Sequence, residues 1–199
     1  MIKVLNLYAG IGGNRKLWPN DKIEVTAVEL NRDIAKIYQD FFPNDKVIVA
    51  DAHQYLLDHY KEFDFIWSSP PCQSHSVCNH FLNAQGVVRY PDMSLYQEVI
   101  FLRTFAKKKP IWVVENVKGY YEPLIYAYEV GRHYIWSNKF ISGLSFEEPD
   151  IGRLNGTHNQ RQNNSRTPQT ERNMVNPKLG LHIFNCAFKI KQTTIGEIQ

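Results

Sequence analysis

The sequence has few cysteines, no long apolar run and no large excess of either charge. It contains 3 cysteines among 199 residues, an odd count without the paired spacing of a zinc site. We therefore expect no disulfide framework and no bound metal, and a reducing cytoplasmic environment. No stretch is long and apolar enough to cross a bilayer, and the first residues lack the pattern of a secretion signal, so we expect no membrane partner.

The remaining composition is typical of a folded domain, with 43% hydrophobic and 22% charged residues. The net charge of +3 is small but unevenly distributed. Between residues 151 and 180, five basic residues stand against one acid, among many Asn and Gln side chains. Such a segment suits phosphates and base edges, although a polar loop without a partner has the same composition. The five are Arg153, Arg161, Arg166, Arg172 and Lys178.

Short β-rich runs alternate with helical patterns over the first two thirds of the chain. This alternation predicts an α/β fold with a doubly wound, mostly parallel sheet and a small irregular C-terminal region. We divide the chain into a main domain at 1–146, a polar segment at 147–180 and a return segment at 181–199. The predicted strands are Lys3–Leu7, Glu24–Glu29, Val47–Ala50, Phe63–Ser68, Ile111–Glu115, His133–Trp136 and Lys139–Ser142. The predicted helices are Asn31–Phe41, Ala52–His59 and Ser94–Lys107, the last opened by a Ser94–Gln97 capping box, with Leu179–Phe188 a helix or a strand.

A glycine turn with Gly10, Gly12 and Gly13 follows the first predicted strand. Glycine lets a backbone approach a ligand closely because it has no Cβ. Glu29 ends the next strand, about twenty residues on, where an acid accepts hydrogen bonds from ribose hydroxyls. Asp51 ends the third strand. Each acid alone is more often a helix cap, but the ordered set predicts a site the size of adenosine.

A cysteine follows the fourth predicted strand, directly after two prolines. Because proline fixes φ and restrains the preceding residue, Pro70 and Pro71 hold the Cys72 thiol at the carboxyl end of a strand. A thiol so placed is a candidate nucleophile, and a buried structural cysteine is the alternative. Glu115 ends the fifth, wholly apolar strand, where a carboxyl group can hold or donate a proton, or cap a helix.

Taken in order along the chain, these motifs resemble those of the C5-cytosine DNA methyltransferases. The resemblance covers roughly residues 1–140, and it implies a DNA partner, no metal, and S-adenosylmethionine as the methyl donor that becomes S-adenosylhomocysteine. The motifs are Tyr8-Ala9-Gly10-Ile11-Gly12-Gly13, Glu29, Asp51, Pro71-Cys72-Gln73 and Glu115-Asn116-Val117.

The resemblance also implies a role for each motif. Cys72 would attack C6 of a flipped cytosine, Glu115 would stabilise or protonate N3, and Arg132 would help to hold the ring. Tyr8 and the glycine turn would hold the donor, with Glu29 on the ribose and Asp51 on the adenine amino group. The implied cofactor-binding set is Tyr8, Ala9, Gly10, Ile11, Gly12, Gly13, Glu29, Leu30, Asp51, Ala52 and Pro71. The implied substrate-binding set is Gln73, Ser74, Asn116, Arg153, Arg161 and Arg166.

Two parts of that family's pattern are missing, a large target-recognition domain and a final motif that returns to the cofactor pocket. We therefore expect recognition of a short DNA sequence by residues 147–180, or recognition completed by a second copy of the chain in a homodimer. No nuclease is apparent, so restriction-modification in a bacterial or phage-infected cell would need another protein.

Two alternatives remain open from the sequence. A tRNA cytosine-5 methyltransferase would use the same Cys72 and Glu115. A non-catalytic nucleic-acid-binding or regulatory protein would explain the missing parts. A Cys–His hydrolase pair with His75 or His80 is not favoured, because surface histidines of a loop explain both residues and no partner acid accompanies either one.

Overall fold

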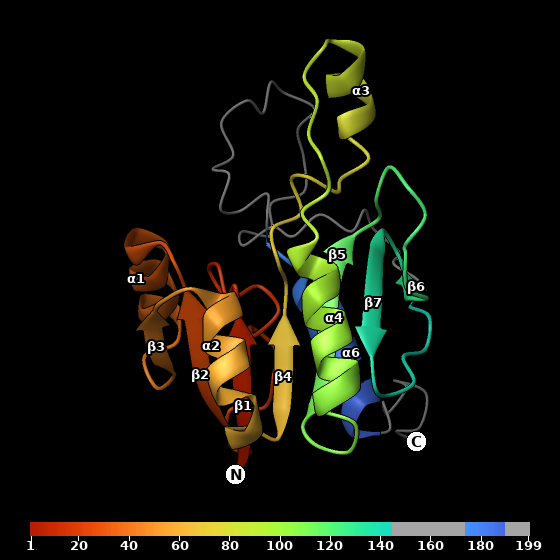
Figure 1. Ribbon diagram of the computed structural model, residues 1–199. Coiled ribbons are helices and arrows are strands. Elements are labelled where there is room, and N and C mark those ends of the chain that lie inside the picture. The colour runs from red at the N-terminus through yellow and green to blue at the C-terminus, as the bar shows by residue number, and fades with distance from the viewer. Residues whose placement is uncertain (145–173, 190–199) are drawn as a thin grey trace, which may run out of the picture.

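The computed structural model describes residues 1–144 and 174–189 and contains a seven-stranded sheet of order β3-β2-β1-β4-β5-β7-β6 (Figure 1). Strands β1 to β5 are parallel, and β7 runs antiparallel to both of its neighbours. This confirms the predicted doubly wound, mostly parallel, Rossmann-like sheet. The strands are β1 (Ile2–Leu7), β2 (Ile23–Glu29), β3 (Lys46–Val49), β4 (Phe65–Ser68), β5 (Ile111–Val117), β6 (Tyr128–Val130) and β7 (His133–Ser137).

Helices cover both faces of the sheet, with α2 and α4 in front and α6 behind (Figure 1). Side chains of a strand alternate between the two faces, so Leu5 and Leu7 pack toward α2 and α4 whereas Val4 packs toward α6. In the part of the chain described here, no helix is long and apolar enough to cross a membrane. The helices are α1 (Arg32–Phe41), α2 (Ala52–His59), the 3-10 turn η1 (Tyr60–Glu62), α3 (Asn79–Ala84), α4 (Ser94–Phe105) and α6 (Pro177–Phe188).

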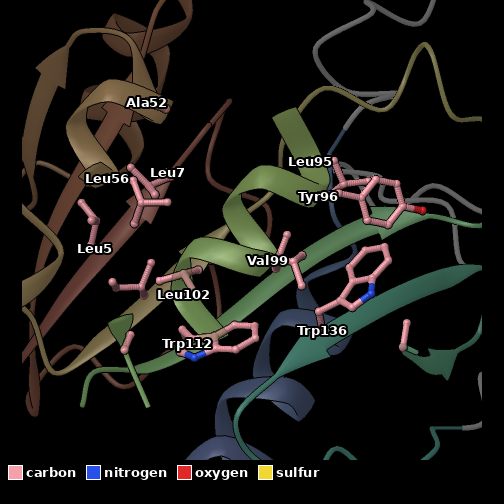
Figure 2. Packing of buried hydrophobic residues seen from close by; sticks show 14 of the residues in the cluster. Leu5, Leu7, Ala52, Leu56, Leu95, Tyr96, Val99, Leu102, Trp112 and Trp136 are labelled. Atoms are coloured by element: carbon pink, nitrogen blue, oxygen red, sulfur yellow. The ribbon is translucent and has the colours of Figure 1, made fainter. Parts of the chain in front are cut away.

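Helix α4 buries one stripe against the sheet. Leu95, Val99 and Leu102 are 0–2% exposed and belong to one buried cluster with side chains of β1, β5 and β7 (Figure 2). Their spacing of three and four residues is the one that places side chains on one face of a helix. The predicted amphipathic helix is thus confirmed, and it lies over the strands that lead to the motifs.

Helix α6 fills the opposite face and is tied to the loop after β1. Phe184 stacks on Trp18 with ring centroids 5.3 Å apart, and the indole Nε1 of Trp18 donates to the carbonyl of Gly180 at 3.1 Å. The helical alternative for Leu179–Phe188 is therefore correct. The helix runs through residue 180, where we placed a segment boundary.

Two local predictions are wrong, and one strand was not predicted. Lys139–Ser142 is not a strand: the Asn138 side chain accepts from the Trp112 N–H at 3.0 Å, and the chain leaves the sheet there. The edge strand is instead β6, joined to β7 through a turn at Gly131, whose φ is +58°. Ser94 does not cap α4, because its N–H donates to Asp92 Oδ1 at 3.0 Å and its side chain makes no cap bond.

The carboxyl ends of the central strands lie level with one another. Leu7 pairs with Val28 on one side and with Ser68 on the other, and Ser68 pairs with Val114. The strand order reverses between β1 and β4, and open α/β sheets bind ligands at such a switch point. The residues that follow this row, and so share that edge, are Tyr8, Glu29, Ser69 and Glu115.

A buried ion pair holds the chain directly after the glycine turn. Arg15 donates to both oxygens of Asp45, at 2.9 and 3.0 Å, and the Tyr38 hydroxyl donates to the same carboxylate at 2.9 Å. The two charged side chains are each 5% exposed. Loss of one partner would leave the other charge buried and unpaired.

We expect Arg15→Ala to lower the free energy of unfolding by about 3–5 kcal/mol, because it strands the Asp45 carboxylate. Urea unfolding followed by circular dichroism measures the change. Lys118→Ala is the matched control: its pair with Glu129 is exposed, and its loss should cost less than about 1 kcal/mol. Equal effects of the two substitutions would contradict a structural role for the buried pair.

Candidate functional site

The turn after β1 adopts left-handed backbone angles at three places, with φ of +53° at Tyr8, +53° at Gly10 and +83° at Gly12. A Cβ on Gly12 would lie 2.3 Å from a ring carbon of Phe42, so this glycine is required for packing. A Cβ on Gly10 would meet nothing within 4 Å. The backbone of Gly10 thus faces open space, and this is the cradle in which a ligand can approach the main chain.

The two acids at the next strand ends lie beside this cradle and are also used within the protein. Glu29 accepts from the N–H of Gly10 at 3.0 Å and from that of Asn31 at 2.9 Å. Asp51 is exposed and caps α2 by accepting from the N–H of Gln54 at 2.8 Å. Leu30, next to Glu29, is 68% exposed. Capping and ligand binding are therefore compatible for both acids, since each carboxylate oxygen has two lone pairs.

Hydrogen bonds fix the loop that carries Cys72 both before and after the cysteine. The Asn116 side-chain amide donates to the carbonyl of Pro70 at 2.9 Å and is 2% exposed. The Cys72 carbonyl accepts from the N–H groups of His75 and Ser76, both at 3.0 Å. We predicted Asn116 as a substrate contact, and its amide instead has a partner inside the protein. The half-buried Cys72 therefore lies in a turn whose backbone is held by hydrogen bonds.

Glu115 is 4% exposed, and each of its oxygens has a polar partner. The Ser69 hydroxyl donates to Oε2 at 2.7 Å, and His133 Nδ1 lies 2.5 Å from Oε1. In the antiparallel register Glu115 pairs with Ile135 and Val117 pairs with His133, which makes Glu115 and His133 diagonal neighbours on one face. The sequence analysis missed both partners. The signal for His133 is its even spacing from Ile135 in a buried strand.

The pKa of Cys72 depends on two other residues of the predicted site, Glu115 and Arg132. Burial raises the pKa of the Cys72 thiol above its ordinary value, the Glu115 carboxylate raises that pKa further, and the Arg132 guanidinium lowers it. Arg132 is exposed in the turn before β7. Cys72, Glu115 and Arg132 therefore share one electrostatic environment, although they come from three separate loops or strands.

The other predicted contacts are spread around this centre. Gln73 and Pro71 are exposed, and the Ser74 hydroxyl accepts from the Asp92 N–H at 3.2 Å. His75 Nδ1 lies 2.6 Å from the Tyr121 hydroxyl, so its ring partner is Tyr121 rather than Cys72, which disfavours the hydrolase alternative. Arg153, Arg161 and Arg166, and most of the segment at 147–180, lie outside the described residues.

The sequence matches the C-5 cytosine-specific DNA methylase family over residues 2–124. A tRNA (cytosine(38)-C(5))-methyltransferase from Spodoptera frugiperda is 27% identical over 59% of this chain. The Type II methyltransferase M.Bsp6I from Bacillus sp. (strain RFL6) is 31% identical over 60% of this chain. The chain spans 36% and 37% of the length of these two relatives.

Solved structures with similar chains include two methyltransferases. A SAM-dependent methyltransferase from Agrobacterium tumefaciens matches at 17% identity and a TM-score of 0.43, over 59% of this chain and 39% of that one. A DNMT2 variant from Spodoptera frugiperda matches at 24% identity and a TM-score of 0.40, over 60% of this chain and 37% of that one.

We expect Cys72 in the ligand-free protein to alkylate with a pH midpoint above that of a free cysteine, about 8.5. Glu115→Gln removes a negative charge and should lower this midpoint, whereas Arg132→Gln removes a positive charge and should raise it. Iodoacetamide labelling with peptide-resolved mass spectrometry distinguishes Cys72 from Cys78 and Cys186. Midpoints that do not move in either variant would contradict the shared environment.

Proposed function

This chain belongs to the C-5 cytosine-specific DNA methylase family, and we propose that it transfers a methyl group from S-adenosylmethionine to C5 of a flipped cytosine in DNA. The observation that supports this most is a pair of hydrogen bonds that join the loop of Cys72 to the end of β5 beside the switch point of the sheet. Ser69 donates to Glu115, and Asn116 donates to the Pro70 carbonyl. A thiol nucleophile and a carboxyl group at one site are what addition to cytosine requires.

The residues around the Gly10 cradle fit the proposed donor. The backbone there faces open space, and the Glu29 and Asp51 carboxylates stand at the next two strand ends, as a ribose and an adenine amino group would need. Tyr8, Ala9, Gly10, Ile11, Gly12 and Gly13 would line the methionine side, with Leu30, Ala52 and Pro71 at the margins. When bound, S-adenosylmethionine supplies an electrophilic methyl group.

The proposed chemistry assigns the covalent step to Cys72. Its thiolate forms a bond to C6 of cytosine, and electron density moves through C5 and N3 so that C5 becomes nucleophilic. After C5 has accepted the methyl group, a base removes the C5 proton, the bond from sulfur to C6 breaks, and the thiolate is released. Covalent addition thereby divides one difficult substitution into easier steps.

Glu115 would bind or protonate N3 while C6 is attacked. The Ser69 hydroxyl and the His133 ring fix the orientation of its carboxyl group at 2.7 and 2.5 Å, so little reorganisation is needed when cytosine enters. Arg132 would contact the ring and favour the thiolate through its positive charge. Asn116 acts on the Pro70 carbonyl and so positions the loop.

DNA is the proposed substrate because the family is described as DNA methylases and one relative is named a Type II methyltransferase. The target carbon lies inside the duplex, so the base must be flipped out at a cost of a few kcal/mol. A tRNA substrate is the second candidate, since the other relative is named a tRNA methyltransferase. We propose that the protein acts on DNA in the cytoplasm. Gln73, Ser74 and the 147–180 segment, which includes Arg153, Arg161 and Arg166, would contact the nucleic acid. A homodimer would supply further contacts.

We expect Cys72→Ser to lower methyl transfer at least about a thousandfold while donor affinity changes less than about twofold, because only the nucleophile is lost. Transfer of labelled methyl groups and calorimetric binding measure the two quantities. Cys186→Ser, on α6 behind the sheet, is the control and should stay active. Transfer by Cys72→Ser at the normal rate would refute the covalent mechanism.

We expect His133→Phe to lower the single-turnover rate about tenfold with donor affinity unchanged, because Glu115 loses a hydrogen-bonding partner that orients it. The same substitution in a Glu115→Gln background should have little further effect. Additive losses in the double variant would indicate that His133 acts independently of Glu115.

Substrate choice is tested by incubating the purified chain with labelled donor and either duplex DNA or tRNA. We expect incorporation into DNA and a covalent adduct with DNA that contains 5-fluorocytosine, which retains the bond to Cys72 because the fluorine cannot leave as a proton does. Incorporation into tRNA alone would replace DNA by the second candidate. Lack of an adduct with either would support a non-catalytic role.

A further inference from the structure

A fully buried carboxyl group that the proposed chemistry does not use lies in the middle of α4. Glu98 is 0% exposed. Its Oε1 accepts from the Tyr8 hydroxyl at 2.6 Å and lies 3.0 Å from His53 Nδ1, and its Oε2 accepts from the Ser68 hydroxyl at 2.6 Å. A carboxyl group with this burial is tolerated only when it is paired and hydrogen-bonded, so these contacts form a built cluster.

The three partners of Glu98 come from three different elements at the switch point. Tyr8 begins the glycine turn after β1, His53 lies in the first turn of α2 after Asp51, and Ser68 ends β4 directly before the loop of Cys72. The Glu98 side chain therefore connects two segments that border the proposed donor site, the glycine turn and the start of α2, with the strand end that leads into the Cys72 loop.

The bond to Tyr8 also explains an unusual backbone conformation. Tyr8 is not a glycine, yet its φ is +53°, and such a residue keeps a left-handed conformation only when its surroundings fix it. Its ring is half-buried, and its hydroxyl reaches the Glu98 carboxylate at 2.6 Å. Burial first, and then the charge of Glu98, raise the pKa of Tyr8, so the hydroxyl stays protonated and keeps donating.

We propose that Glu98 is a positioning residue that holds the glycine turn, α2 and the root of the Cys72 loop in the geometry that binds the methyl donor. This inference rests on the proposed function. Because Glu98 is 0% exposed, its side chain is not available to contact the donor itself. It acts through the conformation of Tyr8, through the α2 terminus beside Asp51, and through Ser68.

The cluster also makes donor affinity depend on pH. The hydrogen bond to Glu98 raises the pKa of His53, and the negative charges of Glu98, Asp51 and Asp92 act in the same direction, against burial. Protonated His53 gives the buried carboxylate a charged partner, and this partner is lost as pH rises through the raised pKa. The cluster is therefore best assembled, and the donor best bound, below that pKa.

Calorimetric binding of S-adenosylmethionine to the full chain tests the proposal with Glu98→Gln. The Tyr8 and Ser68 hydroxyls donate to different oxygens of Glu98, and glutamine has an amide NH₂, which is a donor, in place of one of these oxygens. One of the two hydroxyls therefore loses its acceptor. We expect donor affinity to fall at least about tenfold in Glu98→Gln and about threefold in Tyr8→Phe, which removes a single hydrogen bond. The double variant should lose less affinity than the two single losses combined, because both changes alter the contact between residues 8 and 98.

Val99→Ala is the matched control, since Val99 is the next residue of α4, is 0% exposed and packs in the core shown in Figure 2. It should lower the melting temperature and leave donor affinity within about twofold of the wild type. In the wild type, affinity should fall with rising pH through the His53 transition, and His53→Gln should flatten this part of the profile. A purely structural role for Glu98 would change the melting temperature without changing the pH profile.

The outcomes separate the inference from the function on which it rests. A folded wild-type chain that binds no donor refutes both. Normal donor affinity and a normal pH profile in Glu98→Gln refute only the inference, as does an equal loss of affinity in Val99→Ala. If Glu98→Gln does not fold, unchanged affinity in Tyr8→Phe and an unchanged profile in His53→Gln refute the inference, and the expected changes in both support it.

Discussion

The parallel pairing of β1 with both β2 and β4 is the constraint on which the candidate site depends. Leu7 is in register with Val28 and with Ser68, so the three strands end in one row. The chain therefore leaves the sheet at the same edge each time, and motifs as far apart in the sequence as Tyr8 and Glu115 meet there. A shift of one residue in any of these pairings would turn the side chains of that strand to the opposite face. The hydrophobic layers on both faces prevent such a shift, because α2 and α4 cover one side and α6 covers the other.

Two buried carboxyl groups at this edge illustrate different uses of the same chemistry. Glu98 has three partners on three elements and lies under the walls of the site. Glu115 has Ser69 and His133 as partners, and its negative charge raises the pKa of the Cys72 thiol. Because burial of a charge is costly, each group also constrains the residues that solvate it. Both carboxylates need hydrogen-bonding partners because they are buried. These bonds fix the positions of the turn after β1, the loop after β4 and the end of β5.

The sequence was sufficient for the parts of the protein that depend on local pattern. Strand and helix alternation, the apolar stripe of α4, and the acids at successive strand ends follow from periodicity and from where apolar runs stop. The partners Ser69, His133 and Glu98 could not be predicted in this way, because each contact joins residues between 30 and 90 positions apart or depends on a cross-strand register. The edge strand was misplaced for a related reason. The Lys139–Ser142 run has strand-like residues, but Asn138 ends the ladder by replacing a backbone partner of Trp112, and the three residues of β6 are too few to form a pattern.

The electrostatics around Cys72 contain an apparent conflict, which the proposed chemistry resolves. The carboxyl group that should assist at N3 also raises the pKa of the thiol, so in the free protein it works against the nucleophile. A thiol that stays protonated is a weak nucleophile, which protects it from reaction with other electrophiles. Cytosine in the site would place N3 against the Glu115 carboxylate. The proton that the Cys72 thiol gives up would then be held between this carboxylate and N3, which cancels the negative charge that opposes the thiolate. The Arg132 guanidinium would favour the thiolate in the same step through its positive charge. Under the proposed chemistry, the thiol is therefore activated by the base it attacks, and the same carboxyl group makes activation and protonation of N3 parts of one step.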